Sequence, residues 1–224
     1  LTIIDETHHI AAEVFSNSLF QIVTPYMLGL SATMIRKDGL SKVFKMFIGE
    51  VTCKYKRESI DNVVVKAIHY STDDADFNDT VLNYKGTPNY AIMIKKICEY
   101  NPRTEFVLSI LKDVVGDKLN EQIMILAHNK NLLSYIYNAI NNRNIGSVGY
   151  YIGGMKQKYL KISESKKIIL ATYAMAEEAL DIKTLTTLIM ATPKTDVTQA
   201  VGRILREKHE RPMVIDIIDG HNLF

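Results

Sequence analysis

Short apolar runs alternate with longer stretches of helical periodicity along most of the chain. The runs are expected to form strands at residues 1–4, 26–30, 51–55, 62–69, 122–127, 147–151, 167–171, 187–190 and 212–218. Apolar residues at helical spacing predict helices at residues 91–100, 104–115 and 132–140. Strands that alternate with helices in this way predict βαβ units, and therefore an α/β fold of parallel sheets with flanking helices.

A proline and a polar segment divide this pattern. Because the residue before a proline is pushed out of helical geometry, a helix break is expected next to Pro102. Residues 54–62 carry charge and little apolar content, as a linker does. We therefore expect a truncated first lobe at residues 1–58 and a complete second lobe at residues 59–224. The first lobe is too short to bury a core of its own, and Leu1 is not a start methionine, so upstream residues are expected in the full protein.

Composition and charge narrow the classes of function. The chain has 224 residues, of which 47% are hydrophobic and 23% charged, and its formal net charge is +2. Since no basic surplus points to nucleic acid, any such contact must come from a local patch or from backbone amides. Cys53 and Cys98 form neither a close pair nor a zinc pattern, which favours an intracellular, reducing compartment. No apolar run approaches the length of a membrane span, so no membrane contact is expected.

Two acids and two histidines follow the first predicted strand. A strand of a parallel sheet delivers such carboxylates to its C-terminal edge, where nucleotides bind in doubly wound folds. In a functional interpretation Asp5 belongs to the Mg²⁺ shell, mostly through water, and Glu6 orients and polarises the attacking water. A structural role for the acidic pair is the alternative. His8 and His9 are not expected to bind a metal, because adjacent side chains diverge and no third ligand is nearby in sequence.

Two hydroxyl residues follow the strand predicted at residues 26–30. Ser31 and Thr33 could simply cap backbone groups at the strand end. In the functional interpretation their hydroxyls link the acidic site to the facing lobe.

The segment 199–206 places a glutamine and two arginines on one helix face. Gln199, Arg203 and Arg206 are spaced by four and three residues. Gly202 within this helix costs about 1 kcal/mol relative to alanine, which suggests that another group approaches closely there. Two guanidinium groups on one face suit a triphosphate, because each is a permanently charged fork that matches phosphate oxygens. The alternative is an ordinary solvated pair of arginines.

A buried strand predicted at residues 167–171 leads to Thr172. This threonine could donate to a nucleic-acid phosphate, and backbone amides after it could form an anion site. Asp181, further along, could accept from a ribose hydroxyl or pair with an arginine. The alternative is a helix N-cap at Thr172 and a surface acid at Asp181.

Taken in order, these patterns resemble motifs II, III, V and VI of superfamily 2 helicases of the DExH type. The segments that carry the resemblance are Asp5-Glu6-Thr7-His8, Ser31-Ala32-Thr33, Ala171-Thr172, Leu180-Asp181-Ile182 and Gln199-x-x-Gly202-Arg203-x-x-Arg206. Residues 33–39, 151–154 and 191–193 look like the branch that includes XPB-like helicases, phage recombination helicases and the transcription helicases of large DNA viruses. A viral member of this branch would act in the cytoplasm, the nucleus or a viral factory.

The resemblance implies two RecA-like lobes, with ATP and Mg²⁺ between them and a single strand of DNA or RNA across both. It gives Asp5 and Glu6 to Mg²⁺ and water activation, and makes His8 a relay of nucleotide state toward motif III and Gln199. Arg203 and Arg206 would reach the phosphates.

The same resemblance supplies a nucleic-acid surface on the second lobe. Motif IV would be residues 123–129, with His128 and Asn129 at the strand edge facing the nucleic acid. The backbone amides of Gly153 and Gly154 would approach one phosphate, and Thr172 would contact the next. Such contacts position a strand without reading its sequence.

Two departures from the family pattern change the expectation. Family members usually have Ser-Glu-Gly where this chain has Glu177-Glu178-Ala179. Ala179 cannot cheaply adopt the backbone conformations that are open only to glycine, and Glu177 adds negative charge near the phosphates. No Gly-x-x-x-x-Gly-Lys-Thr occurs, so this chain by itself is not expected to hydrolyse ATP. We expect the C-terminal part of an ATP-driven DNA or RNA helicase. The alternatives are a non-hydrolysing nucleic-acid-binding paralogue and the motor subunit of a restriction enzyme or chromatin remodeller.

Overall fold

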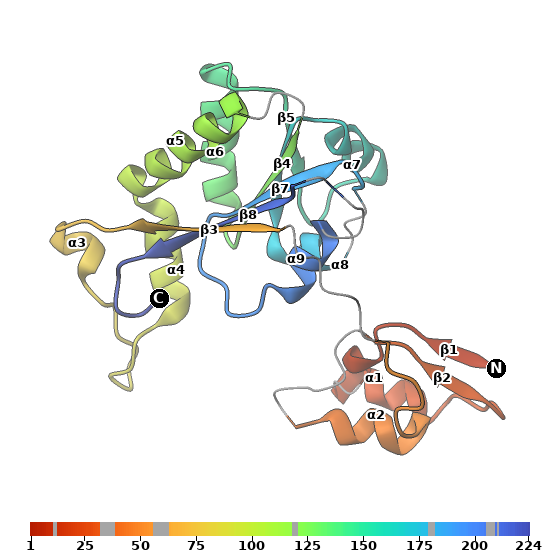
Figure 1. Cartoon of the computed structure of the whole chain (residues 1–224). Helices are drawn as coiled ribbons and strands as arrows, with labels where there is room; N and C mark the ends of the chain where they lie inside the picture. The colour runs from red at the N-terminus through yellow and green to blue at the C-terminus, as the bar shows by residue number, and fades with distance from the viewer. Residues whose placement is uncertain are drawn as a thin grey trace. The chain divides into compact units, whose positions relative to one another are not determined.

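The computed structural model describes residues 1–10, 13–31, 39–55, 63–117, 121–178, 182–204, 209 and 211–224. Contacts divide the chain into two compact units, Leu1–Ser59 and Ile60–Phe224. Figure 1 shows the elements of both units, which are described separately below.

The first unit contains a two-stranded parallel sheet and short helices. Strand β1 (Thr2–Ile4) pairs with β2 (Met27–Gly29), so that Ile3 lies opposite Leu28. The helical elements are the 3₁₀ turn η1 (Thr7–His9), α1 (Glu13–Leu19) and α2 (Ser41–Ile48). Helix α2 buries Phe44 and contacts η1 and β2, which fixes the turn that follows β1.

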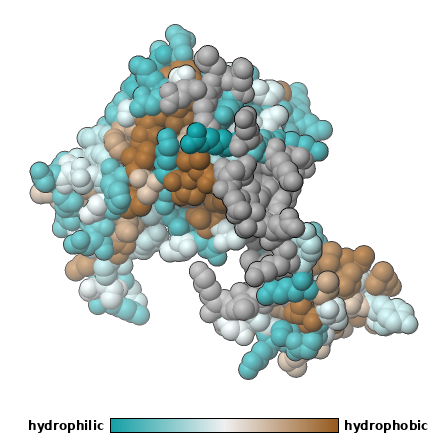
Figure 2. All heavy atoms as spheres, viewed as in Figure 1, coloured by the Kyte–Doolittle hydropathy of each residue, from teal (hydrophilic) through white to brown (hydrophobic). Residues whose placement is uncertain are grey.

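The strands of the first unit expose apolar side chains. Leu1, Ile3, Leu28 and Leu30 are between 43% and 76% exposed. Figure 2 shows apolar atoms gathered on this unit near β1 and β2. Soluble domains seldom expose several apolar side chains side by side, and such a patch is typical of a surface that packs against other protein groups.

The second unit is built on a parallel sheet of six described strands in the order β3-β8-β7-β4-β6-β5. All five neighbouring pairs are parallel. The strands are β3 (Val64–Tyr70), β4 (Gln122–Ala127), β5 (Val148–Tyr151), β6 (Ile168–Thr172), β7 (Leu185–Met190) and β8 (Met213–Asp219). The carboxyl ends of parallel strands lie at one edge of the sheet, so residues far apart in sequence meet there.

Helices cover both faces of this sheet (Figure 1). They are α3 (Ala75–Asn78), α4 (Tyr90–Glu99), α5 (Asn101–Asp117), α6 (Lys130–Asn142), α7 (Gln157–Glu164), α8 (Tyr173–Glu178) and α9 (Thr198–Ile204). Along β4, Ile123 and Ile125 join the core with α4, α5 and α6, whereas Met124 and Leu126 join the core with α7, α8 and α9. Both faces of β4 are therefore buried, which explains its unbroken apolar run.

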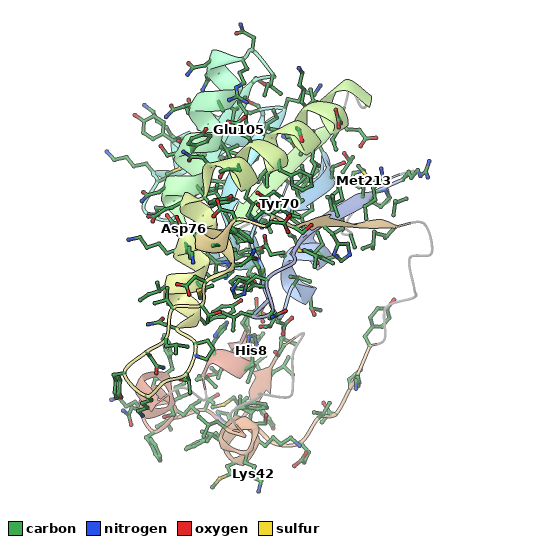
Figure 3. The ribbon with its side chains drawn as sticks, turned by 90° about the vertical axis from the view of Figure 1, so that its left-hand side faces the viewer. His8, Lys42, Tyr70, Asp76, Glu105 and Met213 are labelled. Atoms are coloured by element: carbon green, nitrogen blue, oxygen red, sulfur yellow. The ribbon has the colours of Figure 1, made fainter. Side chains whose placement is uncertain are left out.

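Helices α5 and α6 are also joined at the surface by a charged group. Glu105, labelled in Figure 3, accepts hydrogen bonds from both terminal nitrogens of Arg143, at 2.7 and 2.8 Å, and from the Tyr135 hydroxyl at 2.8 Å. The Arg143 guanidinium, followed by the Tyr135 hydroxyl, lowers the pKa of Glu105. All three side chains are solvated, so the group orients the helices more than it stabilises them.

The α/β fold predicted from the sequence is confirmed. The helix break is also found: α4 ends at Glu99 and α5 begins at Asn101, with Pro102 in the first turn. Proline is tolerated there because the first amides of a helix have no partner within it. The strand predicted at residues 51–55 is wrong. Val51 and Tyr55 are 44% and 86% exposed, and no described strand pairs with this segment. Among the described residues, no helix is long and apolar enough to cross a bilayer.

Candidate functional site

In the first unit, Thr7 fixes the turn that follows β1. Its amide donates to the Leu30 carbonyl at 2.9 Å, and its hydroxyl lies 2.9 Å from the Ile4 carbonyl and 3.1 Å from that of Leu30. The side chain thus joins the ends of both strands. Gly29 makes this possible, since a Cβ at that position would lie 2.7 Å from the Thr7 hydroxyl oxygen.

The two acids lie in this turn. Asp5 is exposed, and its carboxylate accepts from the Glu6 amide at 2.9 Å. Glu6 has φ 48° and ψ 47°, a left-handed conformation that is uncommon for a residue with a Cβ. Such strain tends to occur at functional sites, where surrounding contacts hold it in place.

One carboxylate oxygen of Glu6 is shielded from solvent and has no hydrogen-bond partner among the residues that the structure describes. Nδ1 of His8 lies 3.3 Å from this oxygen. An unsatisfied buried acceptor costs about 1–3 kcal/mol, so a water molecule or a hydrated cation would be favoured there. The carboxylates of Asp5 and Glu6 are also the oxygen ligands that Mg²⁺ prefers. The donor set therefore fits a hydrated magnesium ion.

The structure brings His8 and Ser31 together. Nδ1 of His8 lies 2.8 Å from the Ser31 hydroxyl oxygen, and the His8 side chain is 13% exposed. The expectation that His8 and His9 diverge is wrong, because their ring centroids are 4.1 Å apart. No cluster of three or more metal-binding side chains occurs among the described residues. Thr33 lies outside those residues.

In the second unit, the five predicted nucleic-acid residues lie at one edge of the sheet. His128 and Asn129 follow β4, Gly153 and Gly154 follow β5, and Thr172 ends β6. These three strands are neighbours, since β6 pairs with both β4 and β5. The parallel topology therefore brings together residues that are up to 44 positions apart (172 − 128).

The local structure of this edge is partly explained by capping and turn geometry. Asn129 caps α6, and its side-chain oxygen accepts from the Asn131 amide at 2.7 Å. Gly154 has φ +90°, which L side chains rarely adopt, and a Cβ at either Gly153 or Gly154 would meet no described atom within 4 Å. The Lys130 ammonium donates to the Gly153 carbonyl at 3.3 Å, so a cation lies beside the exposed glycine turn.

His128 is fixed by Thr192, which follows β7. The Thr192 hydroxyl oxygen accepts from the His128 amide at 3.2 Å and lies 2.9 Å from Nδ1 of the ring. The ring also contacts Tyr173, with centroids 4.8 Å apart. Partial burial lowers the pKa of His128, Lys194 lowers it further, and Glu177 opposes the change. The imidazole is therefore mainly neutral at pH 7 and acts through hydrogen bonding.

A buried ion pair behind this edge was missed by the sequence reasoning. Arg103 at the start of α5 donates through Nε and Nη2 to both carboxylate oxygens of Asp219, and through Nη1 to the Ala191 carbonyl at 2.7 Å. Both charged side chains are fully buried. The pair joins α5 to the carboxyl ends of β7 and β8. An acid directly after the strand predicted at residues 212–218 was the available signal, but its partner is 116 residues away.

The predicted arginine helix is only partly described. Helix α9 contains the backbone of Gln199, Gly202 and Arg203, while the side chains of Gln199 and Arg203 lie outside the described part. Arg206 and Asp181 lie outside it altogether. Among the described residues, a Cβ at Gly202 would meet no atom within 4 Å, so the close approach expected there stays a prediction.

Comparison with known proteins finds relatives along nearly the whole chain. It is 37% identical over 228 residues to L396 of Acanthamoeba polyphaga mimivirus, which is described as a candidate ATP-dependent RNA helicase; the match covers 99% of this chain and 44% of the relative. The chain spans about half the length of the curated relatives it matches. A scan against models of protein families finds no match.

Solved structures show the same fold at low sequence identity. T4 UvsW matches with a TM-score of 0.57 and 20% identity, covering 97% of this chain and 44% of that protein. Dbp5 from S. cerevisiae, bound to RNA and ADP BeF3, matches with a TM-score of 0.62 and 12% identity, covering 98% and 53%. These likenesses show a RecA-like helicase fold. Over nearly all of its length the chain is thus similar to helicases of viruses, and it has the fold of RecA-like helicase domains.

Proposed function

We propose that this chain is part of an ATP-dependent helicase or translocase, which couples ATP hydrolysis to movement along DNA or RNA or to its unwinding. The observation that carries the proposal is one edge of the sheet in the second unit. The carboxyl ends of three adjacent strands bring together His128, Asn129, Gly153, Gly154 and Thr172 there. The similarity to L396 supports a helicase-type function.

At this edge the strand would be held through its phosphates. The Thr172 hydroxyl and the amides around Gly153 and Gly154 are donors suited to phosphate oxygens, and Lys130 supplies a positive charge beside them. His128 would contribute a neutral donor or acceptor. Contacts of this kind are insensitive to base sequence and weaken with salt.

In the full-length protein, the nucleotide would be bound by the candidate residues of the helicase motifs. Asp5 and Glu6 would hold Mg²⁺, mostly through water, and Glu6 would polarise the attacking water. Gln199, Arg203 and Arg206 would contact the phosphates, and Asp181 the ribose. His8, through its contact with Ser31, and Thr33 would link the nucleotide state to the rest of the protein.

Binding of single-stranded oligonucleotides by this chain tests the nucleic-acid part. Labelled 20-mers of RNA and DNA are titrated with the chain at two salt concentrations, and fluorescence anisotropy is measured. Thr172→Ala combined with Lys130→Gln should weaken binding severalfold, while Lys95→Gln on α4 should not. The proposed interface would be contradicted if the double variant bound as tightly as the Lys95→Gln control, or if the native chain did not bind at all.

ATP hydrolysis by the full-length protein tests the nucleotide part. Arg203→Ala should abolish nucleic-acid-stimulated hydrolysis, because a phosphate-contacting arginine is worth roughly 10³–10⁵ in rate. Arg211, an exposed arginine before β8, is the matched control. If the Arg203→Ala variant hydrolysed ATP at the native rate, the proposed contact of Arg203 with the phosphates would be wrong.

A further inference from the structure

Glu177 stands where the helicase family that this chain resembles usually has a serine. In the structure its negative charge is paired with a lysine. One carboxylate oxygen lies 2.5 Å from the Lys194 ammonium. The two side chains are only 22% and 21% exposed, so this pair is shielded from solvent more than a typical surface pair. The expected repulsion of phosphates by Glu177 is therefore reduced.

An aromatic ring completes this contact. The Lys194 ammonium lies 5.0 Å from the ring centroid of Tyr173, which is within the range of a cation–π interaction. Tyr173 is buried, and its hydroxyl donates to the Thr192 carbonyl at 2.6 Å. Glu177, Lys194 and Tyr173 form one unit, which we call the α8 clasp.

The clasp joins two sets of candidate residues. On one side, Tyr173 directly follows Thr172, and the segment 192–194 holds His128 through the Thr192 hydroxyl. On the other side, only residues 195–197 separate Lys194 from α9, the helix that carries Gln199 and Arg203. Helices α8 and α9 also pack together within one core. The segment 192–194 is thus a short, covalently continuous link between α9 and the sheet edge that carries His128 and Thr172.

We propose that Lys194 is a positioning residue, and that the α8 clasp transmits nucleic-acid binding at Thr172 and His128 to α9. This inference rests on the proposed function. A phosphate bound at Thr172 would restrain the first turn of α8. Because Glu177 and Tyr173 both hold Lys194, that restraint would reach the segment leading into α9. The family serine has no charge with which to hold a lysine, so the glutamate would serve this link specifically in this protein.

Hydrogen exchange on this chain tests the link without any ATP. Exchange of the α9 amides is followed with and without a saturating single-stranded oligouridine, whose binding is measured separately by anisotropy. In the native chain the oligonucleotide should slow exchange in α9 at least threefold. Lys194→Met and Glu177→Gln should each abolish this slowing while changing oligonucleotide affinity less than about threefold. The reversed pair, Glu177→Lys with Lys194→Glu, should restore part of it.

Lys95→Met is the matched control, because it removes the same charge from an exposed pair with Glu99 on α4. Equal protection of α9 in the native chain and the Lys194→Met variant would overturn the inference while leaving the nucleic-acid interface intact. Failure of the native chain to bind the oligonucleotide would instead overturn the proposed interface, and the inference with it. Lys194→Met could also change α9 exchange in the absence of oligonucleotide. If the reversed pair does not repair that change, Lys194 has a purely structural role and the inference is rejected.

Discussion

Arg103 and Asp219 form a fully buried ion pair that joins the start of α5 to the carboxyl end of β8. The same guanidinium donates to the Ala191 carbonyl, one residue before the threonine that fixes His128. The sheet edge that we propose to bind nucleic acid is therefore stabilised, at the ends of β7 and β8, by an ion pair that is shielded from solvent.

Breaking this pair should strongly destabilise the second unit. Arg103→Met leaves the Asp219 carboxylate buried without its partner, and such losses cost about 3–5 kcal/mol. Urea unfolding followed by circular dichroism measures the change. Arg103→Met combined with Asp219→Leu should cost less than Arg103→Met alone, since the orphaned charge is removed. A single variant as stable as the native chain would refute the assigned importance of the pair.

Gly29→Ala should destabilise the turn that carries the acids. The added methyl group would lie 2.7 Å from the Thr7 hydroxyl oxygen, and overpacking of this kind costs about 1–3 kcal/mol. The effect should shrink in a Thr7→Ala background, where that oxygen is absent. Thermal unfolding of the four proteins of this double-mutant cycle checks the coupling, and strict additivity would contradict the contact.

Asp216→Asn should stabilise the chain at neutral pH. Burial, followed by the nearby Asp219 charge, raises the pKa of Asp216 above its ordinary value. A carboxyl whose pKa is raised on folding destabilises the fold at pH values above its unfolded pKa, where it must ionise. The stabilisation should therefore be present at pH 7 and fade as the pH falls through the raised pKa of Asp216 toward that of the unfolded chain. Urea midpoints measured at several pH values test this, and a pH-independent difference would argue against it.

The two cysteines should differ in reactivity. Cys98 is buried, and burial raises the pKa of its thiol to about 11, while Cys53 is exposed. Because the thiolate is the reactive form, Cys98 should react with iodoacetamide much more slowly than Cys53 in the folded chain. Mass spectrometry of the labelled peptides measures both rates, and urea should make them similar. Equal rates in the folded chain would show that the α4–α5 core opens readily.

Acidification should lower the stability of the second unit through protonation of His128. The pKa of this imidazole is lowered in the folded chain, so the unfolded chain binds the proton more tightly. The stability that depends on the neutral ring is present above the unfolded pKa and is lost as the pH falls toward the lowered pKa of the folded state. His128→Gln should show a smaller fall in melting temperature than the native chain between pH 7.5 and 5.5. The same fall in both proteins would exclude His128 as the cause.

The sequence by itself determined the elements with the strongest local signal. Residues 122–127 were predicted as a strand and form β4 with the same bounds, because both faces of that strand are buried and every position is apolar or paired. The order of strands and helices then determined the α/β class, and ordered short motifs indicated the helicase relationship. Residues 51–55 alternate apolar and polar side chains, as a half-buried strand does, but no described strand pairs with them. Pairing depends on a neighbouring strand, which the local sequence does not reveal.

Only the tertiary structure decided which residues meet. Arg103 reads locally as a charged residue at a helix start, yet it is buried because Asp219, 116 positions later, ends a strand beside it. Glu177 and Lys194 likewise come from different elements and read separately as surface charges. Parallel topology brings distant strand ends to one edge, and burial there makes charges bind one another instead of water. That contact between distant groups is the part of the site that local sequence does not encode.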